Sequence, residues 1–436
     1  YTRDQRASTI RFNTTTSLDN FSGATLFKRQ AQNKVQDLDS FYVQSDLSSK
    51  FVALGLKHEV LAGVDMAKEK KFVYTTPMLS SGNPKTYFDN YFLKTTVAAG
   101  NPNDGASINE AARPLVPGND YDSLGWGVYA QDLFQVAEHW KLLAGLRYDK
   151  LDGSYNSHSY SYNGTSTSIG SFSRTGTQNY AMTVSEWSKR VGALFQPNDR
   201  ESYHFSAATS FNTSGDAYSL GSGNKDLPPE QSINYELGAK IDSADKNFTT
   251  RYALFHSTKL NERNTDPLVS SVTALSGRRH AAGLEMDISG RITPRWEIYG
   301  SFMWVPVAKI DEGAVCSFNG ANARNCLQWG ETIGSRPSLT PRVSATLWNA
   351  YQIDSKWRIG GGINHRGAQA PNRNPGWQAP AFTTADVMAE YRYDDSFTLK
   401  ANVSNITNKL YADQLYDGHY VPGAGRLVQL TGSYKF

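Results

Sequence analysis

Cysteine and histidine, the residues that most often carry chemistry, are few and widely spaced in this chain. The only two cysteines, Cys316 and Cys326, lie in one polar segment with nine residues between them. Neither belongs to a CxxC or Cys/His pattern that would hold a metal ion. The pair therefore predicts a disulfide within an exposed loop, which indicates an oxidising compartment.

The histidines and the familiar enzyme motifs give no sign of catalysis. Eight histidines occur without the paired spacing that metal binding needs: His58, His139, His158, His204, His256, His280, His365 and His419. Only His419, beside Tyr420, would suit a haem ligand pair. The sequence has no GxSxG, HExxH or P-loop, and Gly423-Ala-Gly425 is too short for a dinucleotide fingerprint. We therefore expect no metal site, no cofactor and no catalytic residue.

The elements that carry these residues are expected to be β-strands, because apolar and polar residues alternate along them. In the segment 232–241, Ile233, Tyr235, Leu237, Ala239 and Ile241 fall on one face and polar residues on the other. The segments 139–149, 282–288 and 397–404 alternate in the same way. A period of two gives each strand one face suited to lipid and one suited to water.

The strands are joined alternately by short turns and long loops. We predict fifteen strands, near 36–51, 57–69, 122–137, 139–151, 182–196, 202–212, 230–241, 248–258, 277–289, 294–306, 338–351, 355–367, 382–392, 396–405 and 426–436. The turns at 197–200 and 242–245 have a few residues, whereas the loops at 70–121, 151–180 and 310–337 have tens. This alternation is typical of a transmembrane antiparallel β-barrel of the outer membrane.

The composition agrees with a barrel. Aromatic residues make up 12% of the chain, with 24 Tyr and 9 Trp, which suits aromatic girdles at the membrane surfaces. No run approaches the roughly 18 apolar residues of a membrane helix. The net charge of +3 is dispersed, which argues against a nucleic-acid partner. On composition alone, a tyrosine-rich soluble β-sandwich is the alternative.

Both ends of the chain bear on the strand count. Bacterial barrels close with an even number of strands, so fifteen strands predict a missing start, and Tyr1 to Phe12 are expected to finish one more strand. The signal peptide, a lumen-filling plug domain and the first strands are expected upstream of Tyr1. At the C-terminus, Val428, Leu430, Tyr434 and Phe436 share one face and form a candidate signal for barrel assembly. The alternative is the edge strand of a soluble sheet.

Longer motifs resemble TonB-dependent siderophore receptors. Asn402-Val-Ser-Asn-Ile-Thr-Asn-Lys-Leu-Tyr411 followed by Tyr420-Val-Pro-Gly-Ala-Gly-Arg426 is similar to their closing signature. Leu227-Pro-Pro-Glu-Gln-Ser-Ile-Asn-Tyr-Glu-Leu-Gly-Ala-Lys240 and Gly127-Val-Tyr-Ala-Gln-Asp132 with Gly145-Leu-Arg-Tyr-Asp149 resemble earlier strands of the family. The resemblance implies a 22-stranded barrel of which residues 1–436 supply about 15 to 16 strands, without the plug domain.

Three further motifs resemble the Fiu/PiuA group of catecholate siderophore receptors. They are Ser276-Gly-Arg-Arg-His-Ala-Ala-Gly-Leu-Glu285, Gly290-Arg-Ile-Thr-Pro-Arg-Trp296 and Ala370-Pro-Asn-Arg-Asn-Pro-Gly-Trp377. The resemblance implies a multi-pass protein of the bacterial outer membrane that takes up ferric catecholate siderophores. It implies coupling to TonB-ExbB-ExbD through the missing N-terminal part, and contact with outer-membrane lipid and lipopolysaccharide.

A ferric catecholate is aromatic and polyanionic, so its site should offer cations and aromatic faces. External segments supply such candidates: Arg324, Trp329, Arg336, Arg373, Trp377, Tyr416, His419 and Tyr420. The alternative is that these side chains bind no siderophore and only solvate the surface or contact lipopolysaccharide. Iron needs no protein ligand, because the siderophore already supplies six oxygens.

Three classes of function remain open on the sequence. They are an energised receptor, for this or another cargo such as a hydroxamate siderophore or haem, a passive porin, and a soluble or surface β-structure that binds partners by its loops. The closing signature and the large loops favour the receptor. A plug domain upstream of Tyr1 would support the receptor, whereas an immediate signal peptide would support the porin.

Overall fold

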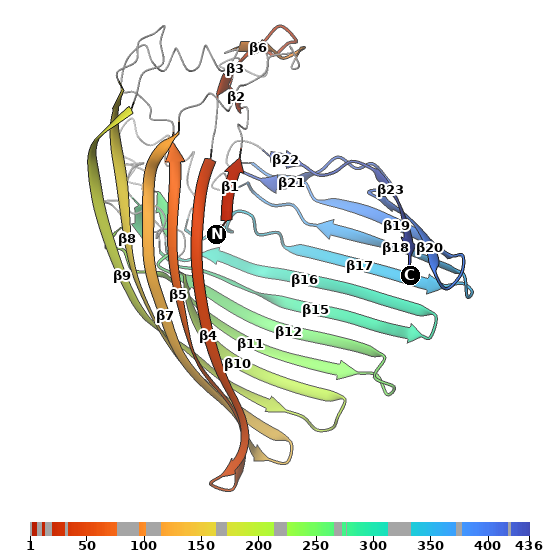
Figure 1. Ribbon diagram of the computed structural model, residues 1–436. Helices are drawn as coiled ribbons and strands as arrows, with labels where there is room; N and C mark the ends of the chain where they lie inside the picture. Colours follow the sequence, from red (N-terminus) through yellow and green to blue (C-terminus); the bar gives the residue numbers. More distant parts are fainter. Residues whose placement is uncertain are drawn as a thin grey trace.

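The computed structural model consists mainly of one large, curved antiparallel β-sheet (Figure 1). It describes residues 2–6, 11–13, 20–30, 34–75, 96–101, 115–162, 172–212, 225–265, 273–275, 277–312, 333–371, 377–416 and 420–436. In these ranges, no helix is long and apolar enough to cross a membrane. The strands of the sheet follow one another in chain order, so each hydrogen-bonds to its neighbours along the sequence.

Sixteen strands make up this sheet. In order they are β1 (Thr2–Arg6), β4 (Lys34–Ala53), β5 (Leu56–Thr75), β7 (Val116–Ala137), β8 (Trp140–Tyr162), β9 (Phe172–Phe195), β10 (Glu201–Asn212), β11 (Glu230–Asp242), β12 (Phe248–Leu260), β15 (Arg279–Thr293), β16 (Trp296–Ile310), β17 (Val343–Gln352), β18 (Trp357–Arg366), β19 (Phe382–Arg392), β20 (Phe397–Ser404) and β23 (Leu427–Tyr434). All fifteen predicted strands are confirmed, and β1 is the strand expected within Tyr1 to Phe12. We call the end of the sheet with the short connections the turn end and the opposite end the loop end.

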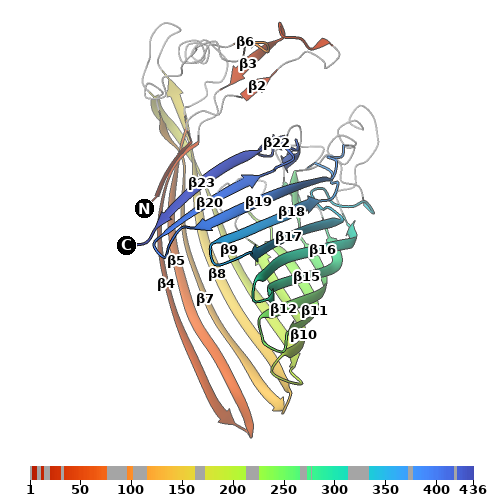
Figure 2. The same ribbon diagram turned by 90° about the vertical axis from the view of Figure 1, so that its right-hand side faces the viewer.

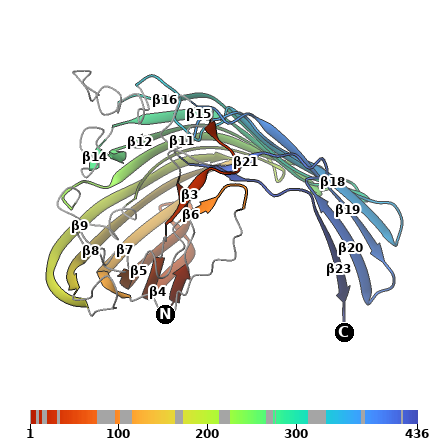
Figure 3. The ribbon, with the colours of Figure 1, turned by 90° about the horizontal axis from the view of Figure 1, so that it is seen from above.

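The sheet is an arc that stays open between its first and last strands. Figure 3 shows this arc from above, with β4 near one edge and β23 at the other. Among the described residues, β1 pairs with β4 and β23 pairs with β20, and no pairing joins β1 to β23. Every residue of β23 is exposed to solvent. The backbone donors and acceptors along the free edges of β1 and β23 are therefore open to further strands.

Three small sheets lie among the connections at the loop end. The first joins β2 (Arg11–Asn13), β3 (Leu26–Gln30) and β6 (Thr96–Ala98), and Figure 2 shows it beyond the end of the main sheet. The other two are hairpins, β13 (Arg263–Thr265) with β14 (Thr273–Leu275) and β21 (Ala412–Leu415) with β22 (Tyr420–Pro422). Because β3 pairs with β6, the connection before β4 and the connection after β5 are fastened to each other.

The two faces of the sheet differ as the alternation predicts. Leu237 and Leu254 are cross-strand partners, and each is 55% exposed. We call the face that carries them the outer face. Glu236 and Lys240 are on the opposite, inner face. Large apolar side chains left in contact with the surroundings over so many strands suit a lipid environment.

Aromatic side chains form rows at two levels of the outer face. Near the loop end, the Tyr148 ring lies 5.5 Å from Trp126 and 4.9 Å from Trp187, measured between centroids. Near the turn end, Trp140 lies 4.8 Å from Phe195. Trp140 and Tyr148 are on the same strand, about 26 Å apart at ~3.3 Å per residue. The strip between them is apolar, so the rows correspond to the girdles of a membrane barrel.

Strands β5 and β7 to β9 continue beyond the aromatic row at the loop end. There the outer face becomes charged, and Lys68 forms an ion pair with Asp122. The inner face becomes apolar and includes a buried cluster made of Tyr121, Tyr155, Met182 and Val184. The predicted loops at 70–121 and 151–180 were therefore too long. Beyond the aromatic row, apolar side chains move from the outer to the inner face. This change interrupts the alternation from which the ends of the strands were predicted.

Several short turns at the turn end use the same side-chain contact. The Asn198 Oδ1 atom accepts the N–H groups of Arg200 and Glu201, at 2.9 and 3.0 Å. Asp354 accepts from the residues two and three positions on, and so does Asp394. An Asn or Asp side chain that binds the backbone just ahead of it stabilises a tight turn.

Candidate functional site

The structure describes four of the eight predicted ligand-binding residues, and these four lie in connections at the loop end. Arg324, Trp329, Arg373 and His419 are outside the described residues, as are Cys316 and Cys326. The structure does describe Arg336, Trp377, Tyr416 and Tyr420.

Three of the predicted aromatic side chains are exposed. Tyr416 directly follows β21 and is 43% exposed, and Tyr420 begins β22 and is 53% exposed. Both therefore flank the tip of one hairpin. Trp377 is 68% exposed in the neighbouring connection between β18 and β19. Exposed rings of this kind can stack with an aromatic ligand.

Arg336 has a different environment, because it is partly buried against β16. It donates a hydrogen bond to the Val305 carbonyl. Burial lowers the pKa of Arg336, and the nearby charge of Arg342 lowers it further. Arg342 itself donates to the Pro306 carbonyl at 3.2 Å. The part of the chain described by the structure shows no ion pair between either guanidinium and a carboxylate, so this arginine pair is a local excess of positive charge.

Arg342 was missed by the sequence prediction. It falls within the predicted strand 338–351, whereas β17 begins only at Val343. No repeat or spacing in the sequence indicates that Arg342 lies before the strand and not within it.

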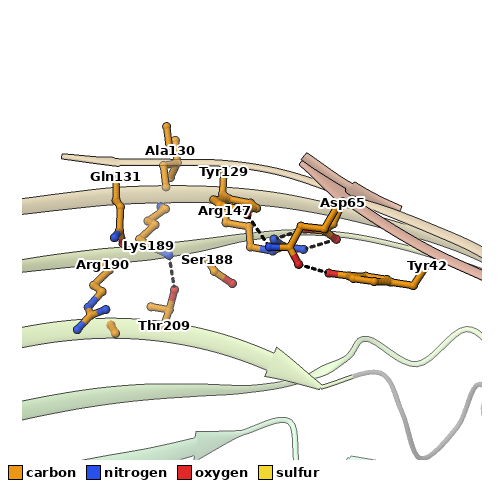
Figure 4. A pocket seen from close by; sticks show the side chains of 14 residues that line it. Tyr42, Asp65, Tyr129, Ala130, Gln131, Arg147, Ser188, Lys189, Arg190 and Thr209 are labelled. Atoms are coloured by element: carbon orange, nitrogen blue, oxygen red, sulfur yellow. Dashed lines mark hydrogen bonds and ion pairs between the residues drawn. The ribbon is translucent and has the colours of Figure 1, made fainter. Parts of the chain in front are cut away.

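The inner face carries a hollow with a volume of about 470 Å³, and charged and polar side chains are among those that line it (Figure 4). Arg147 lies beside it and is held by Asp65 at 2.6 Å and by Asp149 at 2.5 Å. Short side chains such as Ser188 line the hollow, and Arg190 borders it. A second hollow of about 420 Å³ is lined by Tyr299, Trp348 and Asp386, among others. The charged side chains of the two hollows, such as Arg147 and Asp386, give the inner face groups that can bind water.

No group of three or more His, Cys, Asp or Glu side chains that could hold a metal ion occurs within the described ranges. The arrangement at the loop end can instead bind an anion by charge and an aromatic group by stacking.

A comparison with protein families decides the class of this molecule. The family described as "TonB dependent receptor-like, beta-barrel" matches residues 1–406. The chain belongs to this family. The resemblance stated from the sequence motifs, the β-barrel fold class and the location in the bacterial outer membrane are thereby confirmed.

Two relatives of this barrel carry the names of siderophore receptors. The probable TonB-dependent siderophore receptor PiuA of Acinetobacter baumannii is 25% identical over 434 residues, which cover 95% of this chain and 55% of PiuA. The catecholate siderophore receptor Fiu of Escherichia coli K12 is 24% identical over 421 residues, which cover 90% of this chain and 50% of Fiu. The chain therefore spans about half the length of the relatives it matches.

Solved structures of the same two receptors share the fold of this barrel. The closed form of Fiu superposes with a TM-score of 0.76 at 22% identity, over 95% of this chain and 57% of that one. PiuA superposes with a TM-score of 0.74 at 22% identity, over 94% of this chain and 57% of that one. A likeness at this level of identity establishes the fold of the receptor barrel.

Proposed function

We propose that the chain is the C-terminal barrel portion of a receptor for TonB-dependent uptake of ferric siderophores of the catecholate class. The similarity to PiuA and Fiu over 90 to 95% of this chain carries the proposal. The paired aromatic rows and the apolar strip between them support a barrel that spans the membrane. The plug domain and the remaining strands are expected in the rest of the receptor.

The chemistry of the loop end suits such a cargo. A ferric tris-catecholate presents flat aromatic rings and negative charge, and Arg336 with Arg342 offers positive charge without a paired carboxylate in the described structure. Trp377, Tyr416 and Tyr420 offer exposed aromatic faces. Arg324, Trp329, Arg373 and His419 remain predicted ligand contacts. Iron is the cargo and is held by the siderophore.

The partners follow from the same proposal. External loops capture the ferric siderophore, binding is relayed to the plug, and TonB-ExbB-ExbD acts on the plug to admit the cargo. Lipid is expected against the apolar strip of the outer face. Lipopolysaccharide is expected at the charged outer surface beyond the aromatic row, where Lys68 and Lys150 project. No catalytic step is needed for this function.

Two other functions compete with this one. A passive porin would need an open lumen and no plug, and a receptor for a hydroxamate siderophore or haem would share the fold but differ in cargo. Similarity to receptors along most of the chain disfavours the porin. Cargo is therefore the property to measure.

The test is a tryptophan-fluorescence titration of the full-length receptor in detergent with a ferric catecholate and, separately, a ferric hydroxamate. We expect selective quenching by the catecholate with a Kd below about 1 µM, or about −8 kcal/mol. Loss of the exposed ring in Trp377→Ala should weaken binding several-fold, whereas Trp357→Phe, at the turn end, should leave it unchanged. Preference for the hydroxamate would refute the catecholate assignment, and no response to either ligand would refute siderophore binding.

A further inference from the structure

The connection between β20 and β23, residues 405–426, is fastened at its base by one buried side chain. Asn405 is 4% exposed, and its side-chain amide donates to the carbonyl oxygens of Lys409 and Ala424, both at 2.9 Å. Its Oδ1 atom accepts the N–H of Lys409 at 2.8 Å. The backbone N–H of Asn405 donates to the Asp386 carboxylate on β19 at 2.7 Å. Asn405 thus joins the two ends of the loop to each other and to the sheet.

A second asparagine reinforces this base. The Asn408 Oδ1 atom accepts the N–H of Arg426 at 2.9 Å, across the loop. Asn405 and Asn408 have φ angles of 45° and 51°, in the left-handed region that asparagine tolerates better than most residues. Backbone conformation and side-chain hydrogen bonding therefore both favour asparagine at these two positions.

The loop is also packed against the neighbouring strands. The Tyr411 ring stacks on Phe382 with centroids 4.3 Å apart. Arg366 lies over the same Phe382 ring and donates to the Asp413 carbonyl at 2.7 Å. At Gly423, a Cβ atom would lie only 1.9 Å from the Tyr411 ring, so a larger residue would displace that ring. The loop base is therefore a packed unit.

We propose that Asn405 is a positioning residue, which holds the β21–β22 hairpin in place so that Tyr416 and Tyr420 are ready for ligand capture. This inference rests on the proposed function. A loop that is already ordered loses less conformational entropy when the ligand binds, and a loop released at its base would lose more. Removal of the Asn405 side chain should therefore weaken binding without removing any ligand contact.

The test uses the full-length receptor with Asn405→Gly. Glycine tolerates the left-handed backbone and removes all three side-chain hydrogen bonds, so the effect of the side chain is separated from backbone strain. We expect native, heat-modifiable migration on a gel, faster tryptic cleavage after Lys409, and a Kd for ferric catecholate raised about tenfold. If the glycine variant fails to assemble, Asn405→Asp serves instead, because it keeps the acceptor for Lys409 and loses both donors.

The matched control is Asn364→Ala. Asn364 donates to the other oxygen of Asp386 at 3.1 Å, from within the sheet. The Asn364→Ala variant should show the same cleavage rate and the same affinity as the wild type. Wild-type affinity or unchanged cleavage in the Asn405 variant would overturn the proposal. If the wild-type receptor binds no ferric siderophore, the proposed function fails, and the cleavage rate still decides whether Asn405 fastens the loop.

Discussion

Arg147 shows how single residues fix the inner wall of the barrel. Its guanidinium on β8 reaches Asp65 on β5 and Asp149 on its own strand, and it lies over the Tyr129 ring of the strand between, 5.2 Å from the ring centroid. The two carboxylates are largely shielded, with side chains 15% and 20% exposed. The planar, forked guanidinium binds each carboxylate with more than one hydrogen bond in a fixed geometry, whereas a lysine ammonium would act as a single point charge.

We expect Arg147→Ala to destabilise the full-length receptor by about 2 kcal/mol, because the variant leaves two shielded carboxylates unpaired. The effect is no larger because the Arg147 side chain is 34% exposed, and water screens its charge. Arg147→Lys should recover only part of the loss. The control is Lys50→Ala, whose Glu59 partner keeps Lys141. Urea unfolding in detergent measures both, and equal midpoints for Arg147→Ala and Lys50→Ala would contradict this account.

Among the elements, the turn between β11 and β12 depends on an ionised carboxylate. Asp245 accepts hydrogen bonds from the Ser243 hydroxyl at 2.5 Å and from the Asn247 side-chain amide at 2.8 Å. These bonds, with the Ser243 contact the largest cause, lower the pKa of Asp245 to about 2. A pKa that is lower in the folded state stabilises the fold above the unfolded value of about 3.9, and this contribution is lost as the pH falls through the folded value.

The pH dependence can be measured with Asp245→Asn. The unfolding midpoint of the wild type should exceed that of the variant at pH 6, and the difference should shrink between about pH 4 and pH 2 as the carboxylate is protonated. Ser243→Ala removes the hydrogen bond that lowers the pKa of Asp245 most. The loss of stability should therefore begin at a higher pH in this variant. A difference that stays constant down to pH 2 would show that Asp245 does not titrate in this window.

Elements and site were predictable from the sequence to different degrees. Alternation placed β11 (Glu230–Asp242) within one residue of the predicted 230–241, because each face has one environment along the whole strand. The same alternation predicted that β8 ends at residue 151, whereas it ends at Tyr162, because the apolar and polar side chains change faces beyond Tyr148. The site was harder to predict, since Arg342 comes near Arg336 only through the packing of its segment on β16.

At the scale of the whole molecule, the open arc limits what these strands can do alone. The free edges of β1 and β23 would expose unpaired backbone groups to lipid, each at a cost of several kcal/mol. We expect the 436-residue chain, produced alone and refolded in detergent, to show no heat-modifiable band, whereas the full-length receptor should show one. Disruption of the edge by Leu430→Pro in the full-length receptor should also abolish the band, because proline removes a backbone donor from β23. A heat-modifiable, trypsin-resistant band from the isolated chain would mean that these sixteen strands close by themselves.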